Sequence, residues 1–283
     1  MNRGSCLCGA VQYEAGPFDS MEHCHCSMCR RHHGAMFATF LTAPREGFRW
    51  IAGEDEIVTY RSSERGRRPF CRRCGSVVPV VLPDWPDTVF VPAGNVEGDP
   101  GIRPEFHMFA DSSPDWFPIT GPLPRHATFP PAFSEGRTVA ETPVPPPKEG
   151  VVQGHCLCGE VAFELAGIPE VAQNCHCSRC RRARSAAHAT NAFFRREQLT
   201  WIRGEENVVN FALPGAKRFG QAFCRRCGSP VPRVVLSTGY VVVPFGSLDG
   251  PPGRPPRGHI FTGSKAPWYE ITDGLPQWEE LPA

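Results

Sequence analysis

The chain has 283 residues, enough for two domains of ordinary size that each bury a hydrophobic core. Its 30 lysine and arginine residues nearly balance 29 aspartate and glutamate residues, and the net charge of +1 argues against nucleic acid or an anionic membrane as a partner. The sequence has no run of about eighteen apolar residues and no apolar signal core, so we expect neither a membrane span nor secretion.

The apolar stretches in the first part of the chain are short, and glycine, proline and aspartate separate them. They predict strands at residues 10–14, 37–42, 56–60, 77–82 and 88–91. A helical turn is expected after Cys29. The later part repeats this pattern, with strands predicted at 160–165, 208–211 and 240–245. We therefore predict a mainly β protein of small antiparallel sheets with few short helices.

An internal repeat organises the chain. The segment GSCLCG at 4–9 returns as GHCLCG at 154–159, and FCRRCGS at 70–76 returns unchanged at 223–229. Later matches pair His107 with His259 and Trp116 with Trp268. The offsets of 150 to 153 residues differ only slightly, so we infer two copies of one domain with small loop insertions.

The segment between the two copies is rich in proline. Residues 130–150 contain six prolines, which predict an extended, semi-rigid linker. We therefore divide the chain into a first domain at 1–129, a proline-rich linker at 130–150 and a second domain at 151–283. These two domains, which could pack together, are called the first half and the second half below.

The fourteen cysteines fall into the same three groups in each half: C-x-C, C-x-C-x-x-C and C-x-x-C. In a reducing compartment, and we expect a cytoplasmic one, clustered cysteines are more often metal ligands than disulfide partners. Pairing the first group with the third gives a closed tetrahedral zinc site that ties distant segments together and contributes to folding. The predicted structural ligands are Cys6, Cys8, Cys71 and Cys74 in the first half, and Cys156, Cys158, Cys224 and Cys227 in the second.

Three thiols then remain in each half. They are Cys24, Cys26 and Cys29, and in the second half Cys175, Cys177 and Cys180. Zinc with three protein ligands characteristically keeps a position for water or substrate, so these groups predict reactive sites and up to four zinc ions per chain. Iron or another thiophilic metal is the alternative.

Two other interpretations of these cysteines stay open. A histidine could close each three-cysteine site, and the histidines present in both halves are His25 with His176 and His107 with His259. His23, His32 and His33 have no histidine counterparts, so they cannot be ligands common to both halves. Disulfides are a weaker interpretation, because C-x-C pairs form strained rings and seven thiols cannot all pair.

Arginines follow each three-cysteine group: Arg30 and Arg31, then Arg181 and Arg182. They could balance the thiolate charge or bind an anionic substrate. Glutathione, a small thiol with carboxylates, would offer sulfur to zinc and anionic groups to arginine. For the arginine pairs inside the C-x-x-C groups we favour charge balance.

Together these motifs resemble the glutathione-dependent formaldehyde-activating enzyme family, also called the centromere protein V/GFA domain, in two tandem copies. The resemblance rests on G-x-C-x-C-G-x-V, C-H-C-S-x-C-R-R and F-C-x-x-C-G-S in that order, and on the segments 107–124 and 259–276. It implies a β-rich fold with one structural and one reactive zinc per domain. It also implies carbon–sulfur bond formation or cleavage, with formaldehyde and glutathione joined as S-hydroxymethylglutathione.

Two functions follow from this resemblance. The first is a zinc-dependent carbon–sulfur lyase that acts on an adduct of glutathione, or another thiol, with an aldehyde. The second is a non-catalytic zinc scaffold that binds a thiol or a protein. The second copy has Ala183, Arg184 and Ser185 where the first has the sequence HHG, and His188 and Asn191 where the first has phenylalanines. If one half is inactive, we therefore expect it to be the second.

Overall fold

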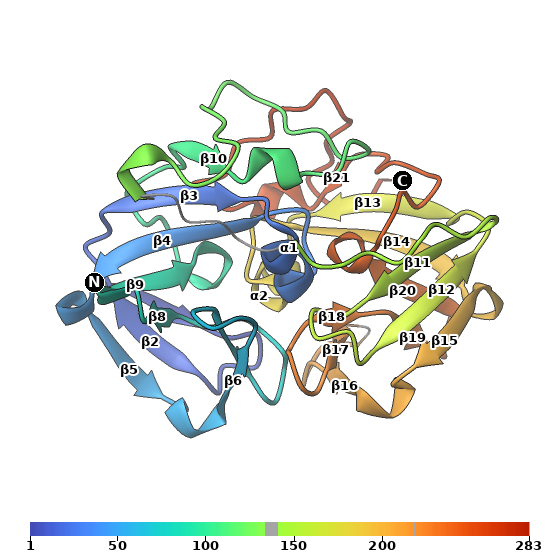
Figure 1. The fold of residues 1–283 in the computed structure, drawn as a ribbon, viewed down its shortest axis with the longest axis horizontal. Helices are drawn as coiled ribbons and strands as arrows, with labels where there is room; N and C mark the ends of the chain where they lie inside the picture. Colours follow the sequence, from blue (N-terminus) through green and yellow to red (C-terminus); the bar gives the residue numbers. More distant parts are fainter. Residues whose placement is uncertain (134–140, 218, 283) are drawn as a thin grey trace.

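The computed structural model describes residues 1–133, 141–217 and 219–282, and its architecture is mainly β (Figure 1). The two α-helices found there have seven residues each, which confirms the prediction of a β protein with few short helices. None of the helices in these ranges is long and apolar enough to cross a membrane. The predicted linker lies partly outside the described residues, because 134–140 are not among them.

The regular elements of the two halves occur in the same order, except that the second half has one additional strand, β18. The first half contains β1 (Asn2–Ser5), β2 (Gln12–Ala15), β3 (Ser20–Cys24), α1 (Ser27–His33), β4 (Ala38–Pro44), β5 (Phe48–Ala52), β6 (Ile57–Arg61), β7 (Arg67–Cys71), β8 (Val80–Leu82), β9 (Trp85–Pro92) and β10 (Phe106–Met108). The second half contains β11 (Val151–His155), β12 (Ala162–Ala166), β13 (Val171–Cys175), α2 (Ser178–Arg184), β14 (Ala189–Arg195), β15 (Leu199–Arg203), β16 (Val208–Ala212), β17 (Gly220–Cys224), β18 (Pro230–Val231), β19 (Arg233–Val235), β20 (Tyr240–Pro244) and β21 (His259–Ile260).

The sheets repeat with the elements. The first half has a three-stranded sheet β1-β2-β5, a five-stranded sheet β10-β3-β4-β9-β8 and the pair β6-β7. The second half has β11-β12-β15, β19-β20-β14-β13-β21 and β16-β17-β18. Most neighbouring strands are antiparallel as predicted, but β10 runs parallel to β3, and β21 runs parallel to β13. This parallel pairing returns the end of each half to the strand that carries the first cysteine of its three-cysteine group.

Both helices begin at the middle cysteine of a three-cysteine group. The side chain of Cys26 accepts a hydrogen bond from the backbone N–H of Cys29 and caps α1, and Cys177 caps α2 in the same way. A side chain that accepts from the third residue of a helix satisfies one of its unpaired N–H groups. The three-cysteine motif therefore also sets the helix start, and the helical turn expected after Cys29 is part of a helix that begins two residues earlier.

The two halves contact each other through equivalent elements (Figure 1). α1 packs on the 3-10 turn η8 (Phe245–Ser247), and α2 packs on η3 (Ala93–Asn95). A Cβ atom on Gly246 would lie 2.3 Å from the carbonyl oxygen of Arg30, so this approach requires glycine. The hydroxyl oxygens of Thr120 and Thr272, which occupy equivalent positions, lie 2.6 Å apart. Contacts between equivalent residues indicate an approximate two-fold relation, as in a symmetric dimer.

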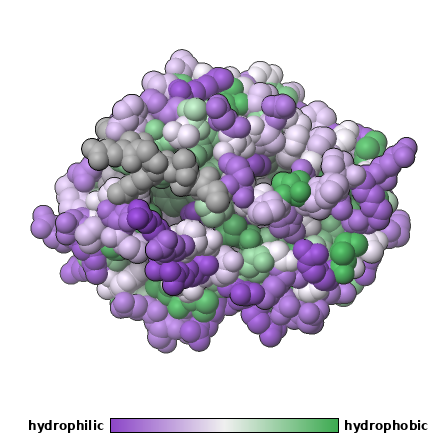
Figure 2. All heavy atoms as spheres, in the orientation of Figure 1, coloured by the Kyte–Doolittle hydropathy of each residue, from purple (hydrophilic) through white to green (hydrophobic). Residues whose placement is uncertain are grey.

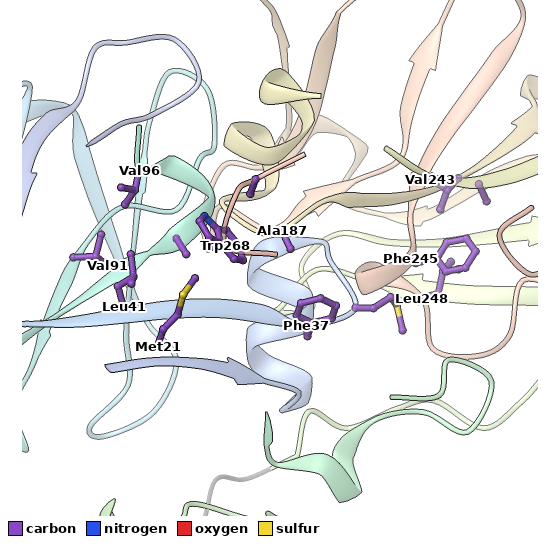
Figure 3. Close-up of a cluster of buried hydrophobic side chains, with 14 of the residues drawn as sticks. Met21, Phe37, Leu41, Val91, Val96, Ala187, Val243, Phe245, Leu248 and Trp268 are labelled. Atoms are coloured by element: carbon purple, nitrogen blue, oxygen red, sulfur yellow. The ribbon is translucent and has the colours of Figure 1, made fainter. Parts of the chain in front are cut away.

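One hydrophobic cluster includes side chains from both halves (Figure 3). Met21 and Leu41 of the first half and Trp268 and Phe245 of the second half are members, and each is at most 2% exposed. Burial of such side chains stabilises the fold by roughly 1.5–3 kcal/mol each. The face in Figure 2 is mostly hydrophilic, with hydrophobic residues in small separate patches.

A buried ion pair also joins the halves. The guanidinium of Arg31 lies 2.6 Å from Asp249, both side chains are 5% exposed, and His155 contacts the same carboxylate. Burial alone would raise the pKa of Asp249, but the hydrogen bond from His155 and the charge of Arg31 lower it. In the equivalent pair, Arg182 and Glu97 lie 3.0 Å apart and are much more exposed.

We expect Arg31→Met to lower the free energy of unfolding by about 3–5 kcal/mol, because it leaves a buried carboxylate without its cation. The exposed counterpart Arg182→Met is the matched control, with an expected loss of about 0–1 kcal/mol. A folded-state pKa below the usual value means that the stabilisation is present at neutral pH and is lost as pH falls from the ordinary aspartate pKa of 3.8. Urea unfolding at pH 7 and near pH 3 measures both effects. Equal losses of unfolding free energy for the two variants at pH 7 would contradict a larger stabilising role for the buried pair of Arg31 and Asp249.

Candidate metal centres and reactive site

The C-x-C and C-x-x-C groups of each half come together in space. In the first half the four sulfur atoms lie within 4.8 Å of one another; those of Cys6 and Cys8 are 3.4 Å apart, and those of Cys8 and Cys71 are 3.8 Å apart. A tetrahedron with Zn–S bonds of about 2.3 Å has S–S edges of about 3.8 Å. The second half shows the same arrangement for Cys156, Cys158, Cys224 and Cys227. All fourteen cysteines have free thiols. Both sets therefore fit a closed four-thiolate zinc site.

The backbone around each closed group is arranged for these thiolates. The N–H of Val11 donates to Cys6 at 3.3 Å, and Val161 donates to Cys156 at the same distance. Gly75 follows the last ligand of the first group with a φ of +73°, a conformation that favours glycine. Hydrogen bonds from N–H groups stabilise thiolates and so favour metal ligation.

The three-cysteine group of the first half forms a second cluster. Cys24 ends β3, Cys26 caps α1 and Cys29 lies in the first turn of this helix. Their sulfur atoms lie within 4.8 Å of one another, and all three residues are at most 4% exposed. Within the described ranges, no histidine, carboxylate or fourth thiol joins this cluster. Three converging thiols fit a zinc ion that has one position left for another ligand.

The histidines considered as a fourth ligand contact each other instead. Nε2 of His25 lies 2.9 Å from Nδ1 of His107, and His176 and His259 repeat this pair at 2.8 Å. Burial lowers the pKa of His25 to about 3 and that of His107 to about 4, so both rings are neutral at pH 7. The ring of His259 also contacts the carboxylate of Asp273 at 3.0 Å.

The four arginines predicted near the substrate contact protein groups. Arg30 donates to the carbonyl oxygens of His25 and Ser112, and Arg181 donates to the carbonyl oxygen of His176. Arg31 and Arg182 form the ion pairs between the halves described above. Substrate contact stays a prediction for all four, and a role in holding the helices in place is observed.

A pocket of about 120 Å³ lies beside the three-cysteine group of the first half. Cys24, Cys26 and Cys29 form part of its wall, together with the polar side chains of Glu22, His32, Arg67 and Arg68. Most of the remaining wall is apolar and comes from strands β4, β8, β9 and β10 and from the segment that follows them. The three thiols are therefore buried but face a space that a small molecule can enter.

The sequence was then compared with known proteins. A family model described as glutathione-dependent formaldehyde-activating enzyme (GFA) matches residues 1–112 and again residues 151–264. The chain belongs to this family. The resemblance inferred from the cysteine motifs is confirmed.

Two relatives and one solved structure resemble parts of this GFA protein. A Halomonas elongata protein, provisionally named a glutathione-dependent formaldehyde-activating enzyme, is 31% identical over 128 residues, covering 41% of this chain and 79% of the relative. A Schizosaccharomyces pombe protein described as an uncharacterized lyase is 24% identical over 115 residues, covering 40% of this chain and 82% of the relative. A Rhodobacter sphaeroides crystal structure is 26% identical, covers 44% of this chain and 98% of that one, and has a TM-score of 0.30. Each match spans less than half of this GFA chain.

Arg68 is a residue of the GFA site that the sequence analysis missed. One of its terminal nitrogens lies 3.5 Å from the sulfur of Cys29. Burial alone would lower the pKa of Arg68, but electrostatic attraction to the nearby cysteine sulfurs, Cys29 first, raises it above its ordinary value, so the side chain stays charged. The pKa of Cys29 in turn lies well below the usual thiol value, because the thiols of Cys24 and Cys26 hydrogen bond to it and Arg68 adds its charge. Comparison of the two copies contained a signal for this residue, because the position in β17 that is equivalent to Arg68 in β7 holds glutamine.

The second half of the GFA protein differs at this site. Arg184 occupies the place of His33, and its guanidinium donates to Gln221 and Asn191 at 3.1 Å each. Burial lowers the pKa of Arg184 to about 10, although the charge of Cys180 opposes this effect. Cys177 and Cys180 are half-buried, unlike their counterparts. The two three-cysteine groups therefore have the same cysteines but different surroundings.

Proposed function

We propose that this protein is a zinc-dependent carbon–sulfur lyase that joins or separates a thiol and an aldehyde, with glutathione as the thiol co-substrate. The observation that carries the proposal is the cluster of Cys24, Cys26 and Cys29, which lacks a fourth ligand among the described residues and forms the wall of a pocket. The enzyme names of the GFA relatives support this reaction class. The fourteen free thiols support a reducing, cytoplasmic setting.

Cys24, Cys26 and Cys29 would hold the reactive zinc of the first half, and the two four-cysteine groups would hold structural zinc. A bound zinc ion supplies a Lewis acid that accepts a thiol sulfur or an aldehyde oxygen. Arg68 keeps positive charge beside the sulfur of Cys29 and so stabilises the ligand thiolates. The neighbouring apolar wall limits water around the reacting groups.

His32 provides a hydrogen-bond acceptor in this pocket. Its Nδ1 lies 3.2 Å from the carbonyl oxygen of Cys227, which only accepts, so Nδ1 carries the proton of the neutral ring. Burial lowers the pKa of His32 to about 3, which keeps the ring neutral. Nε2 is buried and has no hydrogen-bond partner in the described structure, and we propose that it accepts from the hydroxyl group of a thiol–aldehyde adduct bound in the pocket.

In the cleavage direction, the carbon–sulfur bond of the adduct breaks and its electron pair stays on sulfur. The hydroxyl oxygen forms the aldehyde C=O bond, and the hydroxyl proton ends on the departing thiol. The reverse reaction joins the same thiol and aldehyde, so no oxidant or reductant is needed. His32 aligns the hydroxyl by accepting its hydrogen bond.

Exchange spectroscopy by NMR tests this function with the zinc-loaded full chain. We expect the protein to speed the exchange between free formaldehyde and S-hydroxymethylglutathione at least about tenfold over buffer. His32→Ala, which copies Ala183 of the second half, is expected to slow this exchange about tenfold or more through loss of the hydroxyl contact. Zinc-loaded protein that leaves the exchange rate at the buffer value would favour the non-catalytic scaffold.

A further inference from the structure

The composition of the pocket beside Cys24, Cys26 and Cys29 is more informative than its position. Six phenylalanines contribute to its wall: Phe40, Phe90, Phe106, Phe109, Phe129 and Phe133. Valine, leucine, methionine and tryptophan side chains add further apolar surface. Glu22, Arg67 and Arg68 form a polar part of the wall, but the apolar part is the larger, and burying the two carboxylates and the ammonium group of glutathione against it would be costly. Formaldehyde has no substituent that could contact this wall.

The second half shows that the fold does not require an apolar wall here. Phe40 is the third residue of β4, and the third residue of β14 is Asn191. Val80 begins β8, and Arg233 begins β19. The strands pair in matching registers, so these positions are structurally equivalent. At these two positions the apolar side chains of the first half are therefore not imposed by the architecture.

The pocket also has the size of a small organic group. Its volume of about 120 Å³ is similar to that of an engineered apolar cavity of about 150 Å³ that binds benzene. The three thiols and the polar side chains of Glu22, His32, Arg67 and Arg68 lie at its wall. A ligand that satisfies both parts needs a sulfur or oxygen function attached to one compact apolar group.

We propose that the first half acts on thiol–aldehyde adducts that carry an apolar group, the size of one aromatic ring or a short branched alkyl chain, next to the reacting carbon–sulfur bond. This inference rests on the proposed function and names its substrate class. The sulfur lies toward Cys24, Cys26 and Cys29, the hydroxyl donates to His32, and the apolar group contacts the phenylalanines. The apolar group can belong to the aldehyde or to the thiol.

The test compares three adducts with the zinc-loaded full chain: formaldehyde with glutathione, benzaldehyde with glutathione, and formaldehyde with phenylmethanethiol. We expect at least one aromatic adduct to show a kcat/KM about tenfold or more above that of S-hydroxymethylglutathione, because burial of a phenyl ring favours it. A preference for the benzaldehyde adduct assigns the apolar group to the aldehyde, and a preference for the phenylmethanethiol adduct assigns it to the thiol. Either result supports the inference.

Two variants copy residues of the second half into the pocket. Phe40→Asn and Val80→Arg are each expected to lower the preference for the aromatic adduct about tenfold. Leu236→Asn makes a similar change at a side chain that is 90% exposed and is the matched control, with no expected change in preference. Melting temperature and zinc content show whether each variant folds. If one pocket variant does not fold, the other alone tests the preference.

Different results would contradict the lyase function and the preference for an apolar group. Turnover of S-hydroxymethylglutathione without a preference for either aromatic adduct, or a preference unchanged in both folded pocket variants, would overturn the inference and leave the lyase function standing. If no adduct is turned over, calorimetric titration with phenylmethanethiol separates the cases. Binding that Val80→Arg weakens about tenfold supports the apolar ligand class without the lyase function, and no binding overturns both.

Discussion

Replacing Cys71 with serine is expected to unfold the first half and to remove one bound zinc ion. Cys71 is fully buried at the end of β7, and its sulfur lies with those of Cys6, Cys8 and Cys74. Structural zinc contributes about 10–16 kcal/mol in small zinc-binding peptides, which is comparable with the whole stability of a domain, about 5–15 kcal/mol. Loss of one ligand also leaves three neighbouring thiolates, two of them fully buried, that repel one another. Circular dichroism and zinc content of the purified variant measure the effect.

Cys224→Ser is the matched change in the second half and should unfold that half by the same mechanism, because its sulfur lies in the equivalent four-cysteine group. Ser63→Ala, in an exposed turn away from the cysteine groups, controls for substitution itself. A cooperative melt that Cys71→Ser leaves unchanged would show that this group is not a structural metal site.

Replacing Cys26 with serine is expected to reduce turnover at least about a hundredfold while the fold persists, because even residues that only support metal ligands change activity by 10–100-fold. Serine is a favourable helix N-cap, so its hydroxyl oxygen can accept the hydrogen bond from the N–H of Cys29 that the Cys26 sulfur now accepts. The substitution therefore separates metal binding from helix formation. Exchange of formaldehyde with glutathione and thermal melting, measured on one preparation, report the two effects.

Cys177→Ser provides the matched control, since Cys177 caps α2 as Cys26 caps α1. If the first half carries the reaction, Cys177→Ser keeps at least about half of the turnover, whereas an equal loss in both variants would mean that both halves react. Global unfolding of Cys26→Ser would make the three-cysteine group structural and would contradict a reactive role.

The sequence predicted several strands with apolar character but missed others, including β5, and it missed strands that lack such a pattern. The predicted segments at 37–42 and 88–91 overlap β4 and β9, which are central strands with buried side chains. β1 and β7 read NRGS and RRPFC, without apolar alternation. β1 pairs with β2 and β7 pairs with β6, and a cysteine directly follows β1 and another ends β7. The stability of these strands therefore comes from contacts with other segments, which the local sequence pattern does not reveal.

The cysteine groups were predictable, and their surroundings were not. Short spacing identified the two three-cysteine groups, and pairing the C-x-C with the C-x-x-C motif in each half identified the two four-cysteine groups. Arg68 and the phenylalanine wall come from segments up to about a hundred residues away from Cys24, and only the fold brings them to it. Comparison of the two copies carried part of this information, since Phe40 and Val80 align with Asn191 and Arg233.

Native mass spectrometry of the purified chain, with and without glutathione, tests most directly whether the three-cysteine groups are metal sites with a position for thiol. We predict four zinc ions per chain, three in Cys26→Ser, and noncovalent addition of glutathione to the fully loaded protein. Two zinc ions that survive mild chelation, with the same number in Cys26→Ser and no bound thiol, would contradict a reactive zinc at Cys24, Cys26 and Cys29.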